Sequence, residues 1–242
     1  MSPGTTPATV YVILGSHACR AGTLMLEHKG IPYRTVTLPV PSQPLVLPLL
    51  GFRGRTVPAM AIDGRRVQTN RAIARFLDEL RPDPPLLPGD PARRREVEVA
   101  EEWADEELQM AARRLVLAGA ARGREGLANG GDDGPLGRLL WQRPLVRRLA
   151  ARALGRVVFN VNARTERQLL ARVPGMLDRI DGWIDAGVLG GDPPTAADYS
   201  VGASLLLLTY RPDVAPQVEW RPARALADLA LRGRPVATVP AR

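Results

Sequence analysis

Residues 56–73, TVPAMAIDGRRVQTNRAI, place a proline, two short strand-like segments, a tight turn and the start of a helix in immediate succession. Ala59–Ile62 and Arg65–Gln68 are predicted to be strands, and Asp63-Gly64 between them is a dipeptide that favours a two-residue hairpin turn. Asn70 is predicted to cap a helix with apolar residues at core spacing. This segment therefore predicts a proline followed directly by a ββα unit.

Towards the N-terminus, the pattern adds a strand, a helix and a second strand. Thr9–Leu14 is a short apolar run rich in β-branched residues, which favours a buried strand. Residues 18–29 place small and apolar side chains on one face, and Gly30 is a common helix stop. Tyr33–Leu38 alternates with period two, and a proline-rich loop that cannot hold a long regular helix follows it. The first nine residues, rich in Pro, Gly and Thr, are expected to be disordered.

Towards the C-terminus, residues 81–91 are proline-rich and are expected to form a stiff segment between two domains. Beyond them apolar residues recur at helical spacing, and no strand is predicted. Pro174 interrupts one such pattern, so that helix is either kinked at Pro174 or begins there. Residues 121–137 are glycine-rich and are predicted to be a mobile loop. The sequence thus predicts an α/β domain at residues 9–80 (βαβ-ββα), a linker, and an all-helical domain at residues 92–236.

The composition excludes several classes of protein. Of 242 residues, 45% are hydrophobic and 24% are charged, as in globular proteins with a packed core. No apolar run approaches the roughly 20 residues of a membrane helix, and the N-terminus lacks the regions of a signal peptide, so a cytoplasmic protein without a membrane partner is expected. Cys19 is the single cysteine and the chain has two histidines, which favours a reducing compartment and predicts no metal site.

The net charge of +8 comes from arginines spread through nearly every segment, with Lys29 the single lysine. Nucleic-acid binding needs basic side chains gathered on one face. The charge is therefore interpreted as a solvated surface, and no nucleic-acid partner is expected.

The order βαβ-ββα with a proline before the third strand, followed by an all-helical half, resembles the glutathione transferase superfamily, whose N-terminal domain is thioredoxin-like. Three motifs carry the resemblance. Residues 16–21 (SHACRA) and 27–33 (EHKGIPY) are similar to segments of theta-class transferases with a serine-type N-terminal motif. Val57-Pro58 resembles the family's cis-proline motif. Residues 191–199 (GDPPTAADY) resemble its helix-capping motif, in which Asp198 is interpreted as a structural capping-box residue.

The resemblance implies glutathione as the thiol cosubstrate. Ser16, at a helix N-terminus that favours a nearby anion, would donate a hydrogen bond to the glutathione sulfur and lower the pKa of the thiol. Val57, directly before Pro58, would pair its backbone with the cysteinyl part of glutathione. Thr69 and Asn70 take the two positions that hold the γ-glutamyl amine and carboxylate. Asn70 can donate to a carboxylate, whereas Thr69 brings no negative charge to the amine.

The same residues also have structural interpretations, and the sequence leaves these open. Ser16 and Asn70 would each serve as an ordinary helix cap. Cys19 takes the place of the buried second cysteine of a redox Cys-x-x-Cys motif and is expected to be packed and inert, with a catalytic thiol as the alternative. His17 would either shift a nearby pKa or only be solvated.

The leading hypothesis is a glutathione transferase acting on a small apolar electrophile, in a pocket lined by residues around 108–115 and the glycine-rich loop. A glutathione-dependent isomerase or dehalogenase, and a non-catalytic binding protein that keeps the fold, are the alternatives. A disulfide reductase that needs Cys19 is the least favoured hypothesis. The resemblance also implies a homodimer.

Overall fold

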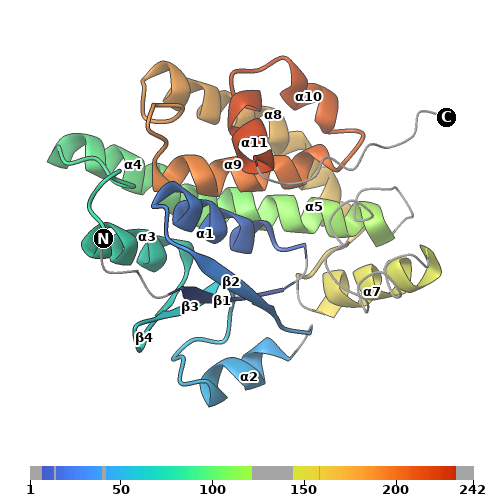
Figure 1. Ribbon diagram of the computed structural model, residues 1–242. Coiled ribbons are helices and arrows are strands. Elements are labelled where there is room, and N and C mark those ends of the chain that lie inside the picture. Colours follow the sequence, from blue (N-terminus) through green and yellow to red (C-terminus); the bar gives the residue numbers. More distant parts are fainter. Residues whose placement is uncertain (1–6, 14, 40–41, 122–143, 158, 233–242) are drawn as a thin grey trace.

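The computed structural model describes residues 7–13, 15–39, 42–121, 144–157 and 159–232. Its N-terminal part is a four-stranded mixed sheet with helices on both faces (Figure 1). The strand order is β2-β1-β3-β4, in which β1 and β2 are parallel and β3 is antiparallel to both β1 and β4. The strands are β1 (Ala8–Val12), β2 (Tyr33–Thr37), β3 (Ala59–Ile62) and β4 (Arg65–Gln68). The predicted βαβ-ββα order is confirmed.

Three helices cover the sheet. α1 (His17–His28) and α3 (Asn70–Leu80) lie on one face, and α2 (Gln43–Leu49) lies on the other (Figure 1). Each face has its own packing, because neighbouring residues of a strand point to opposite sides. Val10 of β1 belongs to the core shared with α1 and α3, while Tyr11 packs edge-to-face against Phe52 on the side of α2.

α2 adds a short helix to the segment that the sequence predicted as a loop. Pro44 lies in its first turn, where a backbone N–H would have no intrahelical acceptor, and Pro48 lies in its last turn. Leu47 is completely buried and anchors the helix on the sheet. The helix has seven residues, so the prediction that no long helix fits between β2 and β3 holds.

The C-terminal part is all-helical over the residues that the structure describes. It contains α4 (Pro91–Trp103), a π-helical turn η1 (Ala104–Leu108), α5 (Gln109–Ala121), α7 (Pro144–Val157), α8 (Ala163–Asp185), α9 (Ala196–Thr209), α10 (Ala215–Glu219) and α11 (Arg224–Leu231). α4, η1 and α5 follow one another directly. α8 runs through Pro174, so the alternative that this helix begins at Pro174 is wrong.

One hydrophobic core joins the two parts of the molecule. It includes residues of α1, α3, α5, α8, α9 and α11. α9 lies at its centre, packed beside α1 and α11 (Figure 1), and nearly all of its residues are buried. The first nine residues were expected to be disordered, but Ala8 and Thr9 belong to β1, where they pair with β2, so the prediction is wrong for these two. Residues 1–6 and most of the glycine-rich segment 121–137 lie outside the described residues.

α9 begins with the predicted capping box. The Asp198 carboxylate is fully buried and accepts hydrogen bonds from the backbone N–H groups of Gly190 and Thr195, each at 2.7 Å, and from the Thr195 hydroxyl at 2.8 Å. The Thr195 hydroxyl oxygen in turn accepts from the Asp198 N–H. The interpretation of Asp198 as a structural residue agrees with this arrangement.

Asp198→Ala is expected to lower the free energy of unfolding by about 2 kcal/mol, because it removes the buried carboxylate that accepts from the N–H groups of Gly190 and Thr195. Asp90, the exposed cap of α4, accepts one N–H from Arg93 and provides the control. Asp90→Ala is expected to cost about 0.5–1 kcal/mol. Denaturant unfolding measures both changes, and equal losses would contradict the prediction.

Candidate functional site

Ser16 lies between the end of β1 and the start of α1. Its hydroxyl oxygen accepts the backbone N–H of Cys19 at 3.2 Å, so Ser16 is the N-cap of α1. Its own N–H donates to the Ile13 carbonyl at 3.2 Å, which fixes the turn. A hydroxyl that accepts a cap hydrogen bond still carries a donor hydrogen. The capping and thiol-activating interpretations of Ser16 are therefore compatible.

Val57 and Pro58 precede β3, and their peptide bond is cis, as the sequence motif predicted. The loop before them is held by Gln68, whose side-chain oxygen accepts from the Gly54 N–H at 2.6 Å and whose amide donates to the Thr56 carbonyl at 3.2 Å. Within the described part of the chain, the backbone N–H and carbonyl of Val57 have no hydrogen-bond partner. The loop therefore presents an unpaired backbone N–H and carbonyl at Val57, two residues before β3. Gln68 is a positioning residue that motif matching did not single out.

Thr69, and not Asn70, caps α3. The Thr69 hydroxyl oxygen accepts the Ala72 N–H at 3.3 Å, and Asn70 is already the first residue of the helix. The backbone of Thr69 has φ of 70°, an outlier for a β-branched residue, and its N–H donates to the Pro58 carbonyl at 3.3 Å. Such outliers persist where the surrounding structure enforces them and cluster at functional sites.

Asn70 points inward, towards the cis proline and α1. Its side chain is buried, its carbonyl oxygen has no hydrogen-bond partner, and a methyl group at Gly22 would lie 3.2 Å from that oxygen and 3.5 Å from Pro58. Within the described residues, the backbone N–H groups of Asn70 and Arg71 also donate to no protein acceptor. Free N–H groups at a helix start can bind a carboxylate. The structure therefore brings Pro58, Thr69 and Asn70 together beside α1.

His17 and Cys19 lie in the first turn of α1, and both are buried. Cys19 is buried and carries a free thiol, and burial raises its pKa although the Ser16 hydroxyl lowers it. This agrees with a packed, inert cysteine. His17 is also buried, so the interpretation of a solvated histidine is wrong. Burial, followed by the charge of Arg113, holds the pKa of His17 well below its ordinary value, and the ring is neutral near neutral pH.

The half-buried side of residues 105–115 is more polar than the sequence indicated. Leu108 and Leu115, expected to bound a pocket for an electrophile, are completely buried in the core. The half-buried residues of the same stretch include Asp105, Gln109 and Arg113. Burial raises the pKa of Asp105 and lowers that of Arg113. Periodicity could not separate these faces, because the π-helical turn η1 changes the helical register within this stretch.

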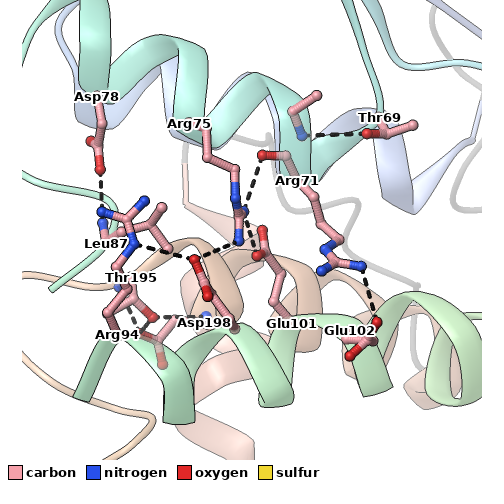
Figure 2. Close-up of polar contacts among 12 residues, drawn as sticks. Thr69, Arg71, Arg75, Asp78, Leu87, Arg94, Glu101, Glu102, Thr195 and Asp198 are labelled. Atoms are coloured by element: carbon pink, nitrogen blue, oxygen red, sulfur yellow. Dashed lines mark hydrogen bonds and ion pairs between the residues drawn. The ribbon is translucent and has the colours of Figure 1, made fainter. Parts of the chain in front are cut away.

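Ion pairs join α3 to α4 (Figure 2). Arg71 reaches Glu102 at 3.4 Å. Arg75 contacts Glu101 at 2.5 Å and Glu98 at 3.3 Å, and Glu101 is completely buried. Removing one partner of a buried pair is strongly destabilising, so these contacts fix the start of α3 against the helical half.

Other parts of the structure bear on ligand binding. A cavity of about 260 Å³ lies between α5, α7 and α8, and none of the predicted site residues lines it. Among the described residues, no three His, Cys, Asp or Glu side chains gather where they could hold a metal ion. None of the described helices combines the length and apolar character that a membrane crossing needs.

Comparisons with known proteins agree with this fold. Residues 15–80 match the family described as glutathione S-transferase, N-terminal domain. No curated protein matches the sequence. A GST-like protein from Pseudomonas syringae is 21% identical with a TM-score of 0.60, covering 93% of this chain and 66% of that chain.

Two further structures are similar over most of both chains. A glutathione S-transferase from Methylobacterium radiotolerans, in complex with glutathione sulfonate, is 22% identical with a TM-score of 0.55, covering 98% of this chain and 99% of that one. A glutathione S-transferase from Ceriporiopsis subvermispora, in complex with glutathione, is 17% identical with a TM-score of 0.61, covering 93% and 98%. At these identities the likeness shows a shared fold, a thioredoxin-like domain followed by an all-helical domain.

Proposed function

We propose that this chain, which carries the N-terminal domain of the glutathione S-transferase superfamily at residues 15–80 and has the superfamily's fold, activates the thiol of glutathione at Ser16 for attack on a small electrophile. Two of the similar structures hold glutathione or glutathione sulfonate. Glutathione would enter here as a cosubstrate, with its γ-glutamyl end at α3 and its sulfur at α1.

The unpaired backbone of Val57 supports this proposal most directly. An N–H and a carbonyl without partners, in a loop fixed by Gln68, can form two main-chain hydrogen bonds with the cysteinyl part of a peptide thiol. The free N–H groups at the start of α3 would bind the γ-glutamyl carboxylate. The buried side chain of Asn70, the first residue of this helix, would hold these N–H groups in position. The Ser16 hydroxyl would then donate to the sulfur, whose thiolate is also favoured by the positive end of α1.

The domain division follows the same proposal. Residues 9–80 would bind the thiol, residues 81–91 would link the domains, and residues 92–236 would line the pocket that binds the electrophile. The superfamily resemblance also leads us to propose a two-fold homodimer in the cytoplasm.

Ser16→Ala is expected to lower kcat/KM for conjugation of an aryl halide by about 100-fold, because the bound thiol loses the donor that stabilises its thiolate. Ser16→Asp separates this role from capping, since a carboxylate is a good N-cap but donates no hydrogen bond. Ser16→Asp is expected to keep the thermal stability of the wild type while losing conjugation. A variant that lacks the hydroxyl but conjugates at the wild-type rate would remove Ser16 from the mechanism.

A glutathione-dependent isomerase or dehalogenase would use the same activated sulfur. Analysis of the product distinguishes these reactions, because conjugation keeps the thiol in the product whereas isomerisation and dehalogenation give a product without it. Titration calorimetry with glutathione tests the non-catalytic alternative. Absence of binding at millimolar glutathione would contradict every glutathione-based function.

A further inference from the structure

The cavity of about 260 Å³ between α5, α7 and α8 takes no part in the proposed thiol site, since none of the residues placed at that site lines it. Five of its eleven lining residues are alanine or glycine, and these small residues leave the space between the helices open. Apolar cavities of about 150 Å³ are large enough to bind benzene. This cavity therefore has room for a larger molecule with a ring system.

One wall of the cavity is apolar and formed by packed helices. Leu117 and Ala118 of α5 are buried, as is Ala151 of α7. α7 comes close to α5 at Gly155, where a methyl group would lie 3.7 Å from Cβ of Leu117 and 3.5 Å from Cβ of Val161. The contact between the two helices holds this wall in place, so it offers a fixed apolar surface to a ligand.

The open side of the cavity carries positive charge. Arg152 and Arg156 both line it, both are exposed, and their spacing of four residues places them on one face of α7. Among the described residues, neither arginine has an ion-pair or hydrogen-bond partner. α8 begins at the same place with Asn162 and Ala163, so the positive end of its dipole adds to the two guanidinium groups.

The negative charge in the lining is compensated within the protein. Glu166 is buried, and its carboxylate lies 2.9 Å from the guanidinium of Arg211, which is buried as well. Arg211 also donates to the Leu115 carbonyl at 2.7 Å, which fixes the ion pair against α5. Glu166 therefore does not neutralise Arg152 and Arg156. The cavity combines an apolar interior with excess positive charge at its opening, and this combination is complementary to an anion with an apolar body.

We propose that this cavity is a second ligand site, which binds a small carboxylic acid with a flat apolar body. The carboxylate lies between Arg152 and Arg156, because a guanidinium presents paired N–H donors that match the two carboxylate oxygens. The rings lie against the wall formed by Leu117, Ala118 and Ala151. Binding is non-covalent and needs no glutathione.

Titration calorimetry with 2-naphthoate tests the charged end of this site. Wild-type protein should bind 2-naphthoate at least about tenfold more tightly than 2-naphthamide, which has the same shape without the charge. The double variant Arg152→Gln/Arg156→Gln should lose this preference and still bind 2-naphthamide as the wild type does. Arg167→Gln, an exposed arginine of α8 that does not line the cavity, is the control and should keep the preference.

Filling the cavity tests its apolar interior. Ala163 lines the cavity and is exposed, so Ala163→Phe places a ring at the opening without disturbing the buried core. This variant should lose binding of both 2-naphthoate and 2-naphthamide. Ala171→Phe, at an exposed position of α8 outside the cavity, should bind both compounds as the wild type does. Equal melting temperatures of the two variants would show that a loss of binding is local.

The outcomes also separate this inference from the proposed function, because the titration needs no glutathione. Saturating glutathione should leave the affinity for 2-naphthoate unchanged. Displacement of 2-naphthoate by glutathione would place the compound at the thiol site and overturn the inference. No binding of 2-naphthoate at millimolar concentration, or equal affinities of wild-type protein and the double arginine variant for it, would overturn it as well. Each of these results leaves the role of Ser16 to its own test.

Discussion

Gly202→Ala is expected to lower the free energy of unfolding by at least about 3 kcal/mol. Gly202 lies in α9, where a methyl group would stand 2.3 Å from the carbonyl oxygen of Leu226 and 3.0 Å from its carbonyl carbon. Both atoms belong to the backbone of α11, so no side-chain rotation relieves the overlap, and the two helices must separate. A melting temperature lower by about 6–12 °C is the corresponding thermal measurement.

Gly182→Ala provides the control for this prediction. Gly182 lies inside α8 with no atom within 4 Å of the position that a methyl group would take. Alanine is the better helix former, so this change is expected to raise stability by about 0.5–1 kcal/mol. A loss of stability for Gly202→Ala together with a gain for Gly182→Ala would indicate that α9 and α11 are in close contact. Equal changes in stability for the two variants would show that these helices are not packed as closely as described.

The Gly202 contact also bears on the proposed site. α11 holds α1 through Arg20, whose guanidinium donates to the Ala230 carbonyl at 3.2 Å. Displacement of α11 would therefore reach the helix that Ser16 caps. Gly202→Ala at a temperature where it stays folded should accordingly lower thiol activation, and Gly182→Ala should not.

Elements set by local chemistry could be predicted from the sequence. Asp63 and Gly64 both have positive φ, at 46° and 75°, as the hairpin turn requires. The capping box at Asp198 forms as its spacing indicated. These features depend on residues close together in the chain, so a short sequence pattern contains most of the information.

Features set by contacts between distant segments could not be predicted. The sequence pattern favoured Asn70 as the cap of α3, because asparagine is a common N-cap. The backbone hydrogen bond from Thr69 to Pro58 moves the cap one residue earlier and holds Thr69 at positive φ. His17 is buried for a similar reason, since α9 packs against the start of α1.

The charged wall of the helical half shows the same limit. The sequence between residues 93 and 114 runs from a block of arginines at 93–95, through a stretch whose charged residues are all acidic at 96–107, to arginines at 113 and 114, which indicates only an exposed helix face. Whether Asp105 finds an ion-pair partner depends on which arginines of α3 have already paired with α4. The pairing of these charges is therefore set by the packing of α3 against α4, which a pattern within one segment of the sequence does not contain.

Lys29→Met is expected to lower the free energy of unfolding by about 3–5 kcal/mol. The side chain of Lys29 is completely buried, and its Nζ lies 2.5 Å from the Asp78 carboxylate. It also donates to the carbonyls of Arg81 at 2.7 Å and Pro84 at 2.5 Å. Methionine fills a similar volume but leaves the Asp78 carboxylate without its cation and the carbonyls of Arg81 and Pro84 without this donor, although Asp78 still accepts from the N–H groups of Leu86 and Leu87. Equilibrium denaturation measures the loss, and a change below about 1 kcal/mol would contradict it.

Lys29 is the single lysine of a chain with 33 basic residues, although arginine carries the same charge. A guanidinium is planar and presents five donors, whereas this site converges several acceptors on one ammonium. Lys29→Arg is therefore expected to destabilise the protein as well, despite keeping the charge. Arg172→Lys, on an exposed pair with Glu107, is the control and should change stability by less than about 0.5 kcal/mol.

The Lys29–Asp78 pair can be isolated by adding Asp78→Asn to Lys29→Met. The double variant is expected to be more stable than the sum of the two single losses, because removing both charges leaves no buried ion without its partner. The burial of Lys29 also has a direct chemical readout. An amine-acylating reagent should modify Lys29 only when the segment from Arg81 to Pro84 detaches from α1, so the labelling rate should rise in Asp78→Asn. A Lys29 that is acylated at the same rate in native and unfolded protein would show that this segment does not cover it.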